Sequence, residues 1–130
     1  MTKTNPSSNS KGSKFSRGDV NESTFEQQQY LYLTTRGRKS GALREIEIWF
    51  THLDGRFYVI AEYPTSHWVQ NLHADPRVRV RIAGKSFDAR FRVIQRETDP
   101  KLHRAVQELS RQKYGWGDGV VVELTPEQVV

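Results

Sequence analysis

The sequence contains no cysteine, so a disulfide framework, a thiolate zinc site and a catalytic thiol are all excluded. Long apolar runs are also missing: none approaches the ~18 residues of a membrane-spanning helix. The N-terminus lacks the apolar stretch of a secretory signal peptide. We therefore expect a soluble, cytoplasmic protein with no membrane span.

Apolar side chains are scarce in residues 1–24, where only Met1, Phe15 and Val20 occur. Serine, threonine and asparagine dominate this segment, and its lysines and arginines outnumber its acids. Such a segment buries too little surface to offset its ordering entropy, which predicts a disordered basic tail. Residues 25–130 have ordinary globular composition, and the length of 130 residues fits one domain.

Positive charge is in excess, with 20 lysines and arginines against 15 acids, a net charge of +5 and a pI near 9.7. This excess favours an anionic partner: a nucleic acid, a phosphorylated cofactor or an acidic membrane surface. Charge alone does not choose among the three.

Alternation of apolar and polar residues predicts six strands. They are Tyr30–Thr35, Arg44–His52, Arg56–Glu62, Arg77–Ile82, Ser86–Ile94 and Gly119–Leu124. A short helix is predicted after a Thr65 or Ser66 cap, ending at Asp75–Pro76, and a second one opens at Asp99–Pro100 and ends before Gly115. We expect a mainly β (α+β) fold: a six-stranded antiparallel barrel with two helices packed at its side.

Two hairpin turns set a predicted register, one at Asp54–Gly55 and one at Gly84–Lys85. The second turn places Arg79 opposite Arg90, and the first places Glu47 opposite Glu62. Like charges repel across strands, so we expect the acidic row to meet the arginine row, either between neighbouring strands of one barrel or across a homodimer seam.

The first predicted turn, residues 34–41, is the richest candidate site. Together with Arg44 it offers four cations, a serine hydroxyl and two glycines that free backbone amides. Phosphate groups need several convergent donors of this kind, which indicates an anion-binding nest. A solvated basic hairpin tip explains the composition equally well. The spacing does not fit a Walker A loop.

Other catalytic patterns receive no support. The four histidines show no i, i+4 pairing and no nearby cysteine, so no metal site is predicted. A GxSxG motif is missing, which leaves serine hydrolase chemistry unsupported.

Two motifs, TTxGRxSGxxR ending at Arg44 and WxxNLxxxP from Trp68 to Pro76, resemble the deazaflavin-dependent nitroreductase family; the strand Ser86–Phe91 continues the likeness. The resemblance implies a split β-barrel oxidoreductase domain over residues 25–130, which acts as a homodimer. It also implies a hydride transferred from coenzyme F420, a deazaflavin, to a quinone, nitroaromatic or similar acceptor.

The resemblance assigns a position to each matched residue. Phosphate and glutamyl-tail contacts are implied for Arg38, Lys39, Ser40, Gly41 and Arg44. Backbone contacts to the ring are implied for Val59, Ile60 and Ala61, and a border of the ring groove for Trp68 and Asn71. The acceptor side is implied for Tyr63, Tyr114 and Trp116, the last two in a flexible turn. No catalytic side chain is implied, because the cofactor carries the hydride.

The chain departs from the family in its loop Tyr63–Ser66, which lacks the longer glycine- and lysine-bearing form, and in Glu45–Glu47, where a Thr-Pro pair is common. The short loop leaves FMN open as an alternative cofactor. A non-catalytic binding protein for a lipid, haem or single-stranded nucleic acid is also left open.

Overall fold

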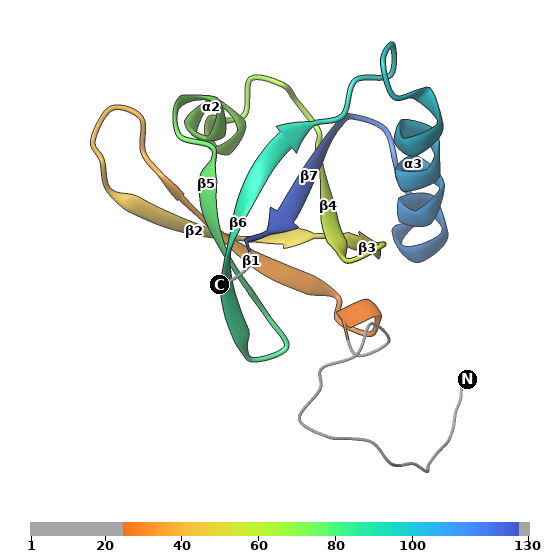
Figure 1. Cartoon of the computed structure of the whole chain (residues 1–130), viewed down its shortest axis with the longest axis horizontal. Helices are drawn as coiled ribbons and strands as arrows, with labels where there is room; N and C mark the ends of the chain where they lie inside the picture. Colours follow the sequence, from red (N-terminus) through yellow and green to blue (C-terminus); the bar gives the residue numbers. More distant parts are fainter. Residues whose placement is uncertain (1–24, 128–130) are drawn as a thin grey trace.

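Seven antiparallel strands and the helices α2 and α3 form the fold, in a computed structural model that describes residues 25–127 (Figure 1). The expected class, a mainly β antiparallel barrel with two helices, is confirmed, with seven strands in place of six. The predicted tail, residues 1–24, lies outside the described residues. In chain order the elements are β1 (Tyr30–Arg36), β2 (Leu43–Trp49), β3 (Thr51–Leu53), β4 (Arg56–Ala61), α2 (His67–Ala74), β5 (Arg77–Ile82), β6 (Lys85–Val93), α3 (Pro100–Tyr114) and β7 (Val120–Pro126).

The seven strands form one curled sheet in the order β2-β1-β5-β6-β7-β4-β3, and every pairing is antiparallel. The two strands at the ends of this order, β2 and β3, follow one another in the chain and are separated by Phe50 alone. The sheet is therefore curled back on itself, and a split remains between β2 and β4.

The break at Phe50 explains why the predicted strand Arg44–His52 is in fact two strands. The backbone N–H of Phe50 donates to the hydroxyl of Tyr114, and its carbonyl oxygen lies 2.8 Å from the same hydroxyl. A side chain of α3 thus replaces the strand neighbour that Phe50 would otherwise need. Alternation in the sequence carries no information about such a distant partner.

The predicted turn at Gly84–Lys85 is wrong by one residue. The turn residues are Ala83 and Gly84, whose φ values of 52° and 78° are those of a type I′ hairpin. This shift pairs Arg79 with Asp88 instead of Arg90, and their side chains form an ion pair of 2.9 Å.

The predicted pair of Glu47 and Glu62 is also wrong, because β2 pairs with β1 and Glu47 lies opposite Tyr32. The Tyr32 hydroxyl donates to Glu47 at 2.7 Å, and the Arg81 guanidinium lies 4.1 Å from the centre of the Tyr32 ring. Arg81 also pairs with Glu45 at 3.1 Å. One ion pair, between Arg81 and Glu45, therefore joins the two rows within one chain, but it reaches across β1 and does not connect neighbouring strands.

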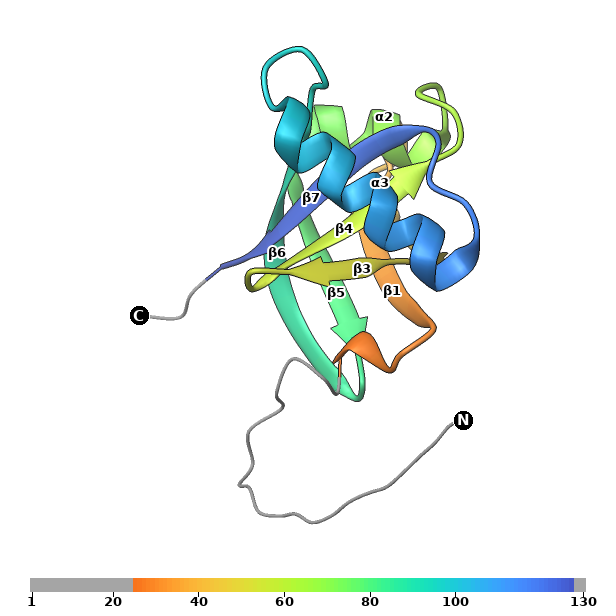
Figure 2. The ribbon, with the colours of Figure 1, turned by 90° about the vertical axis from the view of Figure 1, so that its right-hand side faces the viewer.

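Two apolar clusters hold the helices against the sheet. The larger cluster fills the barrel and includes fully buried Leu72 of α2. The smaller cluster lies between α3 and the outer face of β4 and β7, where Val106 packs with Tyr58 and Val121. Figure 2 shows α3 crossing in front of these two strands. Burial of these apolar faces positions both helices.

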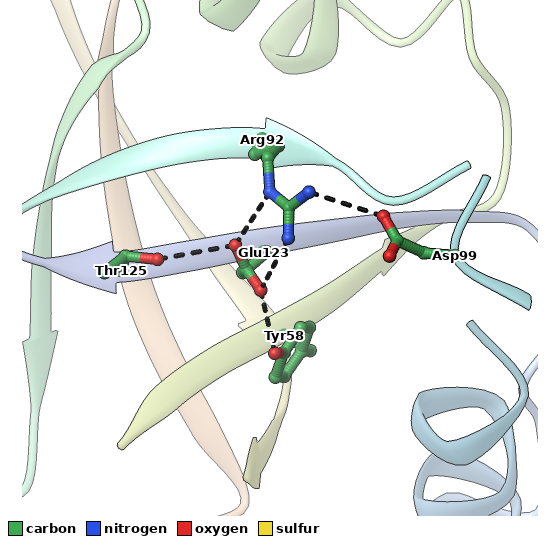
Figure 3. Close-up of polar contacts among 5 residues, drawn as sticks. All are labelled: Tyr58, Arg92, Asp99, Glu123 and Thr125. Carbon is green, nitrogen blue, oxygen red and sulfur yellow. Dashed lines mark hydrogen bonds and ion pairs between the residues drawn. The ribbon is translucent and has the colours of Figure 1, made fainter. Parts of the chain in front are cut away.

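A polar network lies on the outer face of β4, β7 and β6 (Figure 3). The carboxylate of Glu123, only 5% exposed, accepts a bond from the Tyr58 hydroxyl at 2.9 Å and bonds from Arg92 at 3.1 and 3.4 Å. Arg92 also reaches Asp99, the N-cap residue of α3, at 3.4 Å. The network links three strands to the start of α3.

Candidate functional site

The basic turn between β1 and β2 faces the first half of α2 across a pocket of about 440 Å³. We call it the anion pocket. Its lining supplies two guanidinium groups, an ammonium group, an imidazole and a carboxamide, and none of the described residues that line it is acidic. This donor set suits a phosphate or carboxylate group. The lining residues are Gly37, Arg38, Lys39, Ser40, Arg44, His67 and Asn71.

Asn71 joins the turn to the helix. Its Oδ1 accepts bonds from the backbone N–H of Arg38 at 3.2 Å and from the Arg38 guanidinium at 2.8 Å. Asn71 is buried, with 5% of its surface exposed. With Oδ1 occupied by Arg38, the carboxamide N–H groups are the part of Asn71 that is left to serve as donors in the anion pocket.

Ser40 and Gly41 shape the turn. The Ser40 hydroxyl accepts from the backbone N–H of Ala42 at 3.1 Å, and the carbonyl of Gly41 accepts from the Arg36 guanidinium at 2.8 Å. The N–H of Gly41 donates to the carbonyl of Gly37 at 2.8 Å. These bonds hold the bend that presents Arg38 and Lys39.

A second pocket, about 260 Å³, lies at the split between β2 and β4, under the end of α3. We call it the aromatic pocket. Along β2, Arg44 in the anion pocket and Ile48 in the aromatic pocket are four residues apart, which corresponds to about 13 Å of strand. A ligand with a charged tail and a flat ring could contact both pockets. The lining residues are Tyr30, Glu47, Ile48, Trp49, Phe50, Thr51, Tyr58, Ile60, Ser110 and Trp116.

The backbone of Ile60 faces the split. Residues of an antiparallel strand direct their N–H and C=O groups alternately to the two neighbouring strands. Val121, the β7 partner of Ile60, uses its carbonyl for Ile94 on the far side, so the groups of Ile60 point away from β7. On that side β3 ends at Thr51, which pairs with Tyr58. Ile60 therefore lies beyond the end of β3 and offers one donor and one acceptor to the aromatic pocket.

Trp49 and Tyr114 form a stacked pair beside the aromatic pocket, with ring centres 4.5 Å apart and planes inclined by 8°. Lys113 reinforces the contact: its ammonium group lies 4.0 Å from the centre of the Phe50 ring and donates to the Phe50 carbonyl at 3.2 Å. Burial lowers the pKa of Lys113 and raises that of Tyr114. Tyr114 and Lys113, at the end of α3, thus hold Trp49 and Phe50 in the wall of the pocket.

Replacing Tyr114 by phenylalanine should lower the free energy of unfolding by about 1–2 kcal/mol, because the buried backbone of Phe50 loses its hydroxyl partner. Urea denaturation measures this loss. Tyr63→Phe is the matched control, since the Tyr63 side chain is 60% exposed, and it should stay within about 0.5 kcal/mol. Equal losses in both variants would show that the Tyr114 hydroxyl does not stabilise the backbone of Phe50.

The segment expected to be a flexible acceptor turn is held at both ends. Lys113 and Tyr114 belong to α3, and Gly115 ends that helix with a φ of 80°. Beyond it, the Ser110 hydroxyl donates to the carbonyl of Trp116, and Gln107 donates to the carbonyl of Gly117 at 3.1 Å. The expected turn therefore begins only at Gly115, and α3 side chains bind its backbone at Trp116 and Gly117.

The structure brings two groups of the implied site residues together. Arg38, Lys39, Ser40, Arg44 and Asn71 share the anion pocket, and Ile60 and Trp116 share the aromatic pocket. The others lie elsewhere: Val59 and Ala61 are buried in the fold, Trp68 packs against the main core, Tyr63 is exposed, Gly41 supports the turn and Tyr114 stacks behind Trp49.

Most residues that line the aromatic pocket, and two that line the anion pocket, were not among the candidates; His67 and Trp49 are the two with the clearest chemical use. His67 lies one helical turn before Asn71, and this i, i+4 spacing was a usable signal. Trp49 alternates with core residues in the sequence, and nothing local distinguishes it from an interface aromatic.

The described residues also bear on two other kinds of site. They contain no cluster of three or more His, Asp or Glu side chains placed to hold a metal ion. Nor does any helix in residues 25–127 have the length and apolar content to cross a membrane.

Comparison with known proteins relates this geometry to a family. The model of the F420H(2)-dependent quinone reductase family matches residues 11–121. Among curated proteins, none matches the chain significantly.

Solved structures share the fold at low identity. The haem storage protein HutZ from Vibrio cholerae is 19% identical, with a TM-score of 0.67 over 82% of this chain and 88% of that one. A putative pyridoxamine 5'-phosphate oxidase from Listeria innocua is 17% identical, with a TM-score of 0.64 over 80% of this chain and 88% of that one. The F420-H2 dependent reductase FDR-A is 20% identical, with a TM-score of 0.61 over 77% of this chain and 95% of that one.

Proposed function

The chain belongs to the F420H(2)-dependent quinone reductase family, and we propose from this that it reduces a quinone or a similar acceptor such as a nitroaromatic, with F420 spanning its two pockets. When bound, the reduced cofactor supplies a hydride, and a quinone that receives it also takes up one proton to become a hydroquinone. The protein's own residues bind and orient the reactants.

The anion pocket is the observation that carries this proposal. Lys39 and Arg44 are exposed and free of any ion pair with the described acids, so their charges are available to a ligand. Arg38 is held by Asn71 and therefore presents its guanidinium in a fixed orientation. A phosphate and the carboxylates of a glutamyl tail are the groups that such a pocket accepts.

The aromatic pocket supports the placement of the ring. The backbone donor and acceptor of Ile60 can bind the polar edge of a planar heterocycle, and Trp49 and Trp116 supply flat apolar surface. The acceptor is then expected against the same aromatic surface, which Tyr114 holds in place by stacking on Trp49.

A fluorescence titration with oxidised F420, run in parallel with FMN, tests the proposal directly. Saturable binding of F420 with weaker binding of FMN supports it, and turnover with quinones and nitroaromatics then identifies the acceptor. Preference for FMN would keep the fold and contradict the cofactor. Binding of neither would contradict the redox function.

Replacing Lys39 by alanine should weaken F420 binding by about 1–3 kcal/mol, the usual contribution of a charged hydrogen bond. The free energy of unfolding should not change, because no bond of the fold depends on this side chain. Lys101→Ala, an exposed lysine at the start of α3, is the control and should leave the dissociation constant unchanged. An unchanged constant for Lys39→Ala would remove the turn from the site.

We also propose that the chain forms a homodimer. Leu43, Trp49 and Tyr30, which are 64%, 40% and 40% exposed, lie on the face of β1 and β2 that looks away from the core. Leu43 lies at one end of this face and the Tyr30–Trp49 pair at the other, and exposed apolar groups of this kind are typical of an interface. Sedimentation velocity of the wild type and of Leu43→Lys tests this proposal. We expect a dimer for the wild type and a weaker dimer for the variant; a monomeric wild type would contradict the proposal.

A further inference from the structure

His67 is a pocket residue whose side chain makes no hydrogen bond or ion pair to the described fold. It is the first residue of α2, its side chain is exposed, and it lines the anion pocket together with Asn71, four residues later on the same helix face. No hydrogen bond or ion pair to another described residue restrains its ring. His73, at the other end of α2, differs, since its ring packs edge-on against Phe91 at 5.1 Å.

The charged groups that line the anion pocket together with His67 are all cationic. Arg38 and Lys39 face it from the turn between β1 and β2, and Arg44 faces it from the start of β2. A protonated imidazole here is a further charged donor to an anion bound in the pocket. Histidine is the side chain that commonly changes charge between pH 5 and 8.

We infer that His67 is a pH-dependent contact to the anionic part of the cofactor, so that F420 binds more tightly as the pH falls through the neutral range. The inference rests on the proposed function, because it assumes that the anion in this pocket belongs to F420. It adds a control of affinity by pH. By linkage, a contact that needs the protonated ring makes cofactor binding take up protons.

The test is the dissociation constant of F420 at pH 5.5, 6.5, 7.5 and 8.5 for the wild type, His67→Gln and the matched control His73→Gln. From pH 8.5 to 5.5 the wild type should gain about three- to tenfold more affinity than His67→Gln, as expected for one partly exposed charged contact. His73→Gln should follow the wild type. Any titration of the cofactor itself is common to all three proteins and cancels in the comparison.

Calorimetry in two buffers of different ionisation enthalpy gives a second readout. Wild type and His73→Gln should take up a fraction of a proton on binding F420 at pH 7, and His67→Gln should take up less. Identical pH profiles and proton uptake in wild type and His67→Gln would overturn the inference and leave the proposed function standing. Failure of the wild type to bind F420 at every pH would overturn the proposed function, and the inference with it.

Discussion

A Gly119→Ala variant should lose about 3–4 kcal/mol of unfolding free energy, the largest stability effect that we expect of a single methyl group in this chain. A Cβ at this position would lie 2.4 Å from the carbonyl oxygen of Ala61 and 2.9 Å from Cγ2 of Ile60. The backbone φ of +132° is also strained for any residue with a side chain. Because a backbone carbonyl cannot move aside as a flexible side chain can, β4 and β7 must separate.

Gly55→Ala is the control for this prediction. Gly55 also has a positive φ, +77°, but a Cβ there meets no atom within 4 Å. It should cost about 1 kcal/mol, which reflects the backbone conformation alone. Urea denaturation of both variants gives the two values. A similar loss in both would show that the contact with Ala61 is unimportant. The Gly119 variant should also bind F420 more weakly, since Ile60 is displaced.

A Glu123→Ala variant should lose about 2–4 kcal/mol, because the buried hydroxyl of Tyr58 is left without an acceptor and Arg92 without its main partner. Glu108→Ala is the matched control. Glu108 pairs with Arg111, but its side chain is 57% exposed, so its loss should stay within about 0.5 kcal/mol. Equal losses would refute a structural role for the buried network.

The same network should make stability fall in acid. Burial disfavours the charged form of Glu123, but the bonds from Arg92 and Tyr58 outweigh it, so the pKa of Glu123 is lowered. A lowered pKa in the folded state adds stability above the unfolded value of about 4.3, and this stability is lost as the pH falls through the folded pKa. The urea midpoint of the wild type should therefore drop more steeply between pH 5 and 3 than that of Glu123→Gln. Parallel profiles would contradict this assignment.

Local pattern was sufficient for most of the fold. Strict alternation from Arg77 to Ile82 identifies β5. Asp54–Gly55 identifies the turn of the β3–β4 hairpin, where the two residues have φ values of 53° and 77°. Register was harder, because the turn of the β5–β6 hairpin is at Ala83–Gly84 and alanine is an unusual residue at a positive φ. A shift of this kind changes every cross-strand pair in the hairpin.

The candidate site was predictable where its residues are neighbours in the sequence. Arg38, Lys39 and Arg44 share one turn, and their charge marks it. The aromatic pocket was harder to predict from the sequence, because its wall depends on the contact between Tyr114 and Phe50, which are 64 residues apart. No spacing rule connects two such segments.

The split between β2 and β4 has a consequence for aggregation. An unpaired strand edge can accept a strand from another chain, and natural proteins protect such edges by charge or by cover. β2 carries Arg44, Glu45 and Glu47 within seven residues, while β3 is three residues long and offers little to pair with. The Ile60 backbone beside this edge is the part that a bound cofactor would cover. Depletion of the cofactor is then expected to favour misassembly at the same edge.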